Sequence, residues 1–170
     1  MSHAKNKMDW CLKKAQKELQ EGKKHRGLEV VRTNTAKARE HIAKAEHNLK
    51  VTLYLHQGGY TDWCSSSLFY TLYHCFLAIL AKFGYESRNQ ECTFAVIRSL
   101  IEEKKIALEQ KDIDHIDLLD VSEARESITA THLREEYQYG TKVLLQNHEY
   151  QLFLQLAKKI LDKTKEIIEE

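Results

Sequence analysis

The stretch LFYTLYHCFLAILAKF, residues 68–83, decides the fold class of this chain. Apolar side chains occupy nearly every side of the helix that it would form, and only Thr71, His74 and Lys82 interrupt them. A helix that is apolar all round is buried, either in a protein core or in a membrane. A membrane span needs about 18 or more apolar residues in succession. This shorter run, with a histidine in its middle, therefore predicts a core helix and no membrane association.

The segments on either side of this stretch also predict helices, because the chain contains no proline and only six glycines. Apolar residues recur every three to four positions, and no stretch alternates with the period of a strand. The predicted fold is all-α, an up-and-down bundle of four to five helices with an N-terminal helical extension. Helices are expected over residues 6–21, 34–56, 61–83, 122–139 and 146–168. A further helix is expected after a capping box at Ser87–Gln90, and residues 104–120 are expected to form a charged connection or a short helix. The expected N-caps are Asn34 or Thr35 and Ser122.

A chain of 170 residues has the size of a single domain with one core. Residues 34–170 are assigned to the helical bundle. Residues 1–33 are assigned to a basic extension, whose helix ends at Gly22, and to a linker over residues 22–33. We expect this extension to pack loosely against the bundle.

Positive charge is concentrated at the N-terminal end of the chain. Residues 1–50 contain 13 Lys and Arg against 6 Asp and Glu, whereas residues 51–170 contain 13 against 19. A basic segment is typical of surfaces that bind RNA or an acidic partner, and it is also typical of a solvated helix face with a flexible arm. The candidate nucleic-acid-binding residues are Lys23, Lys24 and Arg26.

The four cysteines, Cys11, Cys64, Cys75 and Cys92, form no C-x-x-C pair and lie within apolar helical patterns. This placement predicts reduced thiols that fill the core of a cytoplasmic protein, rather than disulfides or a zinc site. The nine histidines form no set with zinc spacing, so we expect no metal and no cofactor, and His74 is expected to be a hydrogen-bonded core histidine. The polar first 20 residues show no secretory signal.

Three stretches together resemble the HEPN family of prokaryotic proteins. AREHIAKAEHNL (38–49) is similar to the first long helix of HEPN domains, and SLFYTLYHCFLAILAKFGY (67–85) is similar to their second. LREEYQYG (133–140) occupies the place of the family's Arg-x(4–6)-His motif. The resemblance covers about residues 34–168 and implies a four- or five-helix bundle, frequent homodimers and roles related to nucleic acids. Many members are metal-independent ribonucleases of toxin–antitoxin or defence systems, often paired with a minimal nucleotidyltransferase.

The catalytic histidine of that motif is replaced in this sequence. Metal-free RNA cleavage needs a base for the ribose 2′-hydroxyl proton and a cation for the phosphate charge, which histidine and arginine supply. The motif arginine is Arg134, and Tyr139 stands five positions later, in place of the histidine. A phenol with a pKa of about 10 is a poor base near neutral pH, although it can donate a hydrogen bond to phosphate. Glu135, where active members often carry Asn or Asp, is expected to hold the guanidinium and to repel phosphate.

A second pair of residues stays open as an alternative catalytic motif. Arg125 and His132 also satisfy Arg-x(6)-His, and seven residues are about two helical turns, which would place both side chains on one helix face. Arg134 and Tyr139 would instead lie about 140° apart on a straight helix. Helix geometry favours the pair of Arg125 and His132, whereas the sequence context favours Arg134 as the family's arginine.

These observations lead to three functional hypotheses. The favoured one is a dimeric module that binds RNA, a nucleotide or a minimal nucleotidyltransferase without cleaving RNA. The second is a metal-independent ribonuclease toxin that uses an arginine with His132. The third is a structural bundle with a pocket for a small ligand.

Overall fold

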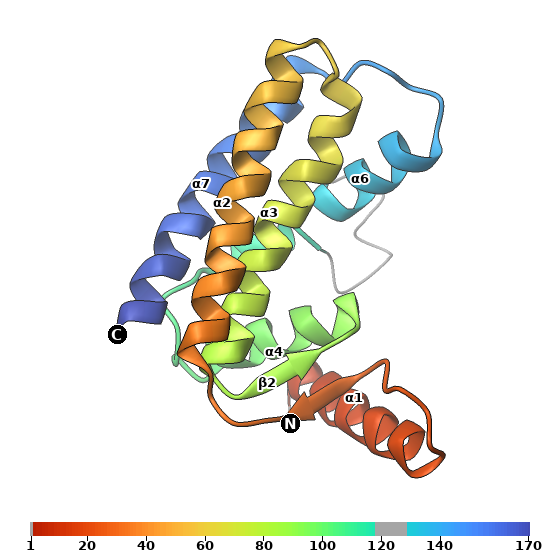
Figure 1. Cartoon of the computed structure of the whole chain (residues 1–170), viewed down its shortest axis with the longest axis vertical. Helices are drawn as coiled ribbons and strands as arrows, with labels where there is room; N and C mark the ends of the chain where they lie inside the picture. The colour runs from red at the N-terminus through yellow and green to blue at the C-terminus, as the bar shows by residue number, and fades with distance from the viewer. Residues whose placement is uncertain (1, 118–128) are drawn as a thin grey trace.

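The computed structural model describes residues 2–117 and 129–170, and these form helices apart from one small sheet. Figure 1 shows α2, α3 and α7 side by side as long helices, with α6 beside α3 and with α1 and α4 at the end away from the α2–α3 turn. The predicted all-α helical bundle is therefore confirmed. The described elements are α1 (His3–Gln20), β1 (Leu28–Val30), α2 (Thr35–Gln57), α3 (Thr61–Lys82), β2 (Tyr85–Ser87), α4 (Gln90–Glu102), α5 (Gln110–Asp114), α6 (Ala130–Tyr139) and α7 (Asn147–Glu169).

Helix α3 forms the centre of the core, as its apolar sequence predicts. Leu68, Phe69, Leu72, Phe76 and Ile79 are each at most 1% exposed. Burying a side chain of this size stabilises the fold by roughly 1.5–3 kcal/mol relative to leaving it in water. By length and composition α3 could also cross a membrane, but 67% of its most apolar window is buried inside the protein.

Polar caps fix the residues at which α2 and α4 begin. The Asn34 side chain accepts a hydrogen bond from the Lys37 N–H at 2.9 Å, which confirms the predicted start of α2. Helix α4 begins after Asn89, whose side chain accepts from the Cys92 N–H at 3.1 Å. The start predicted at Ser87 is therefore too early, because that residue belongs to β2.

Two three-residue strands form an antiparallel pair, so the expectation of a chain without strands is wrong. Strand β1 lies in the segment assigned to the linker, and Glu29 at its centre pairs with Glu86 of β2. Strands this short contain too few residues for an alternating pattern to reveal them. The turn before β2 depends on Gly84, whose φ of 78° is left-handed and whose Cβ, if present, would meet the Val31 carbonyl oxygen at 2.8 Å.

The N-terminal extension packs on the bundle more closely than predicted. Helix α1 lies against α4, and its Ala4, Cys11 and Ala15 are each at most 1% exposed. The chain also passes very close to α1 at Gly27, where a Cβ would stand 2.5 Å from the Cys11 carbonyl oxygen. A glycine at this position lets β1 reach β2 while α1 stays in contact with α4.

A disulfide bond joins Cys11 of α1 to Cys92 of α4. The expectation of four reduced thiols is therefore wrong for this pair, whereas Cys64 and Cys75 are buried and unbonded as predicted. Burial raises the pKa of the Cys64 thiol to about 11 and that of Cys75 to about 12, so both stay protonated near neutral pH. The bonded cysteines are 81 residues apart in sequence, and only the packing of two helices reveals their proximity.

We expect alkylation to count two thiols in the oxidised protein and four after reduction, as measured by intact mass after unfolding in iodoacetamide. Closing a chain segment of this length stabilises the fold by about 4.5 kcal/mol in the chain-entropy model. Reductant should therefore lower the midpoint of urea denaturation. Reductant should not change the midpoint of Cys11→Ser, which lacks the disulfide, but it should still lower the midpoint of Cys64→Ser. Four alkylated thiols without reductant would contradict the disulfide.

Candidate functional site

Helix α6 carries the motif arginine, and hydrogen bonds to the segment after α5 hold its start. Ser122, the expected cap, lies outside the described residues. Within them, Thr129 caps α6 by accepting from the His132 N–H at 3.1 Å. The Thr131 hydroxyl donates to the Ile116 carbonyl oxygen at 2.9 Å, and the Thr131 N–H donates to the same oxygen at 3.1 Å. The position of α6 therefore depends on the segment around residue 116.

A buried arginine fixes that segment. Arg98 of α4 is fully buried, and its Nη1 lies 2.5 Å from Asp114 Oδ1. Its Nη2 donates to the Asp117 carbonyl oxygen. Burial raises the pKa of the Asp117 carboxyl to about 6, although the nearby positive charge of Arg98 lowers it. The same arginine thus anchors the segment that supports α6.

The motif arginine is already engaged by two neighbours. The Arg134 guanidinium carbon lies 4.4 Å from the centroid of the Phe69 ring of α3, within the range of a cation–π interaction. Its Nη2 donates to Glu135 Oε1 at 3.2 Å, the contact that the sequence suggested. The Arg134 side chain is 14% exposed. Phe69 and Glu135 therefore already stabilise the positive charge of Arg134, and little of its side chain is in contact with solvent.

The other predicted catalytic residues do not assemble around this arginine. Tyr139 is the last residue of α6 and is 76% exposed. His132 is also exposed, and Arg125 lies outside the described residues. Among the residues that the structure describes, no hydrogen bond or ion pair joins Arg134 to Tyr139 or to His132. The described part of α6 therefore presents no arginine paired with a base.

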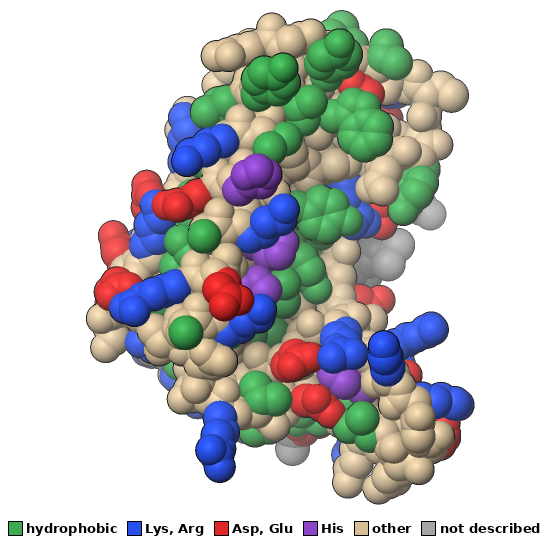
Figure 2. Space-filling view, viewed as in Figure 1, with side chains coloured by type: hydrophobic (Ala, Val, Ile, Leu, Met, Phe, Trp, Pro, Cys, Tyr) green, Lys and Arg blue, Asp and Glu red, His purple; other side chains and the backbone are tan. Residues whose placement is uncertain are grey.

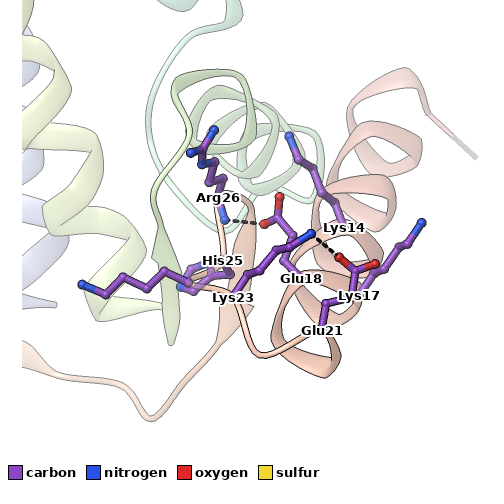
Figure 3. A pocket seen from close by; sticks show the side chains of 8 residues that line it. Lys14, Lys17, Glu18, Glu21, Lys23, His25 and Arg26 are labelled. Carbon is purple, nitrogen blue, oxygen red and sulfur yellow. Dashed lines mark hydrogen bonds and ion pairs between the residues drawn. The ribbon is translucent and has the colours of Figure 1, made fainter.

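The structure does bring the three predicted nucleic-acid-binding residues together. They line a cleft of about 840 Å³ between the end of α1 and the chain that leads to β1 (Figure 3). Two lysines of α1 join them, and the sequence pattern did not single these out because only the fold brings the end of α1 beside the loop. We call this site the basic cleft, and its lining residues are Lys14, Lys17, Glu18, Glu21, Lys23, Lys24, His25 and Arg26.

The two carboxylates of the basic cleft leave most of its cations unpaired. Lys23 Nζ lies 2.7 Å from Glu21 Oε2, so this predicted binding residue is partly neutralised. Glu18 accepts the main-chain N–H of Arg26 at 2.5 Å and so holds the loop rather than the guanidinium. The remaining cations have no carboxylate partner within residues 2–117 and 129–170; they are Lys14, Lys17, Lys24 and Arg26.

A histidine pair lies elsewhere, on α2 and α3. His41 Nδ1 and His74 Nδ1 are 3.1 Å apart. Both rings are half-buried, so His74 is hydrogen-bonded as expected but is not a fully buried core residue. Burial lowers the pKa of both imidazoles, that of His74 to about 4, with a smaller lowering from the neighbouring ring and Lys44. Sequence reasoning missed the pair because the antiparallel register of α2 and α3 creates it.

The raised pKa of Asp117 predicts a pH dependence of stability. An unfolded aspartate titrates near pH 3.9, and Asp117 titrates at about 6 in the folded protein. Folding therefore takes up a proton between these values, and this group's contribution to the free energy of unfolding falls as the pH rises through that window. Because the carboxyl keeps some solvent contact, we expect a total of about 1–2 kcal/mol.

Urea denaturation at about pH 4 and about pH 7 measures this contribution. Asp117→Asn should match the wild type at the lower pH and exceed its stability at the higher one. Asp162→Asn, on the exposed side of α7, serves as the matched control and should show no such difference. A pH profile of Asp117→Asn that parallels the wild type would contradict the assignment.

No family model matches the sequence, and no curated protein matches it.

Proposed function

We propose that this chain is a HEPN-like module that binds RNA in the basic cleft and does not cleave it. The observation that carries the proposal is the set of four cations, two from α1 and two from the following loop, that surround one cleft without carboxylate partners among the described residues. The resemblance of residues 34–168 to the HEPN family supports a role related to nucleic acids. A toxin–antitoxin or defence system is the proposed setting.

The chemistry of the basic cleft suits a phosphate backbone rather than a particular base sequence. Unpaired lysine and arginine side chains bind phosphates and release the counterions condensed on the nucleic acid. Lys14 Nζ lies 5.1 Å from the centroid of the Trp10 ring, and Trp10 is 48% exposed. An exposed aromatic ring beside cations is typical of single-strand binding, because unpaired bases stack on it. Single-stranded RNA is therefore the proposed ligand.

The surroundings of the motif arginine support binding without cleavage. A cleaving site needs an unprotonated base within reach of the 2′-hydroxyl and a cation exposed to the phosphate. Tyr139 is a phenol at the exposed end of α6, and Arg134 is covered by Phe69 and paired with Glu135. We infer that this helix contributes structure rather than catalysis.

A protein partner is proposed for the opposite end of the bundle. Figure 2 shows hydrophobic side chains gathered at the end of the molecule where α2 turns into α3. Exposed residues near this turn include Tyr54, Tyr60 and Trp63, which are between 58% and 74% exposed. Such a patch is typical of protein interfaces. We propose a second copy of the chain as its occupant and a minimal nucleotidyltransferase as the alternative partner.

The basic cleft predicts salt-dependent binding of single-stranded RNA, measured by fluorescence anisotropy of a labelled oligonucleotide. Replacing two of its cations in Lys24→Gln/Arg26→Gln should weaken binding about tenfold at moderate salt, since an exposed ion pair is worth up to about 1 kcal/mol. The slope of log K against log salt should fall by about 1.4, or about 0.7 per lost phosphate contact.

The matched control is Lys50→Gln/Lys158→Gln, which removes the same charge from exposed positions on α2 and α7. It should bind RNA as the wild type does. Equal weakening in both double variants would indicate a general charge effect and would contradict the basic cleft as the binding site.

The proposal also predicts that RNA stays intact during long incubation with excess protein in EDTA, as judged by gel electrophoresis. Arg134→Gln should bind RNA with unchanged affinity, because its guanidinium is covered in the folded protein. Cleavage that disappears in Arg134→Gln or in His132→Ala would support the ribonuclease instead. Cleavage that persists equally in both variants would come from a contaminating enzyme.

A further inference from the structure

The histidine pair of α2 and α3 lies apart from the basic cleft. Figure 2 shows histidine side chains along the face of the long helices, with Lys and Arg side chains beside them. The rings of His41 and His74 are tilted by 33°, with their centroids 5.3 Å apart and their Nδ1 atoms 3.1 Å apart. Neither the basic cleft nor α6 uses these residues, so the pair is available for separate chemistry.

The separation of the two nitrogens matches the bite of a metal chelate. A first-row cation such as Zn²⁺ binds imidazole nitrogen at about 2.0–2.1 Å, so two such ligands at an angle between about 90° and 110° lie about 2.8–3.4 Å apart. The observed Nδ1 separation falls within this range. In the present contact one Nδ1 donates to the other, so both rings must turn before their lone pairs face a shared ion.

The protonation of the pair also suits a cation. The contact between two neutral imidazoles requires one ring to carry its proton on Nδ1 and the other to accept there. Moving that proton to Nε2 gives two Nδ1 ligands without releasing a proton to solvent. Burial lowers the pKa of both imidazoles, and the neutral imidazole is the form that coordinates metal.

The charges and the space around the pair act on a bound ion in opposite ways. Lys44 repels a cation at His74, and Lys37 repels one at His41, although Lys37 Nζ is paired with Glu40 Oε2 at 2.8 Å. A cavity of about 420 Å³ opens on the His41 side of the pair, and its lining includes Arg32 and Lys37 but not His74. This cavity offers space for water beside His41.

We propose that His41 and His74 bind one divalent first-row transition-metal ion through their Nδ1 atoms and thereby clamp α2 to α3. The site selects ions that prefer imidazole, such as Ni²⁺, Cu²⁺ and Zn²⁺, over Mg²⁺, which prefers oxygen ligands. The proposal is independent of RNA binding in the basic cleft.

Calorimetric titration of the untagged protein, stripped of metal with EDTA and dialysed, with NiCl₂, ZnCl₂ and MgCl₂ tests the site. We expect one Ni²⁺ or Zn²⁺ per chain, no Mg²⁺ and an upward shift of the melting temperature only with the metals that bind. His41→Ala should bind at least about tenfold more weakly, because losing even a supporting partner of a ligating histidine costs roughly that much.

His47→Ala, which removes an exposed histidine from the same helix, is the matched control and should bind Ni²⁺ as the wild type does. His74→Ala should show the same loss as His41→Ala, and the metal-free melting temperature of each variant reports whether it folds. Absence of Ni²⁺ and Zn²⁺ binding in the wild type would overturn the proposal. So would an affinity that His41→Ala leaves unchanged.

Discussion

The burial of the apolar helix α3 is the interaction on which the rest of the structure depends. Helices α2, α4, α6 and α7 all contact it, and its largest side chains are withdrawn from water. Its position then determines which residues of other helices meet. Phe69 lies beneath the guanidinium of Arg134, and His74 lies opposite His41. Both contacts exist because α3 is held at the centre of the bundle.

The cationic side chains differ in how far they are buried and paired. Arg98 and Arg134 are withdrawn from solvent and are neutralised by carboxylates or covered by an aromatic ring. A cation that already contacts a carboxylate or an aromatic ring contributes little binding free energy to a phosphate, because it must first lose those contacts. In the basic cleft, Lys17, Lys24 and Arg26 have neither a carboxylate partner nor an aromatic ring over the charge among the described residues. The difference in pairing, more than the number of cations, is the reason for proposing that RNA binds at the N-terminal extension.

Much of the fold could be predicted from the sequence, because long helices leave a clear apolar period. The core position of residues 68–83 and the cap at Asn34 are confirmed. The two strands and the disulfide of Cys11 with Cys92 could not be predicted, since both depend on how segments far apart in sequence come together. Local pattern does not determine such contacts.

The candidate site was predictable only where its residues are neighbours in sequence. Lys23, Lys24 and Arg26 form a visible charge run, and in the structure they line one cleft. Lys17 of α1 joins them only because the chain folds back on the end of that helix. The pair of His41 and His74 left no local signal. The environment of Arg134 depends on Phe69, and the motif itself does not reveal this aromatic neighbour.

The central claim is that RNA occupies the basic cleft rather than the surface of α6. Amide chemical-shift mapping on titration with single-stranded RNA tests it most directly, because it reports every contact surface at once. We expect the largest shifts on residues 14–26, with those around Arg134 and Tyr139 nearly unchanged. Shifts concentrated on residues 132–140, with little change in α1 and the loop after it, would contradict it.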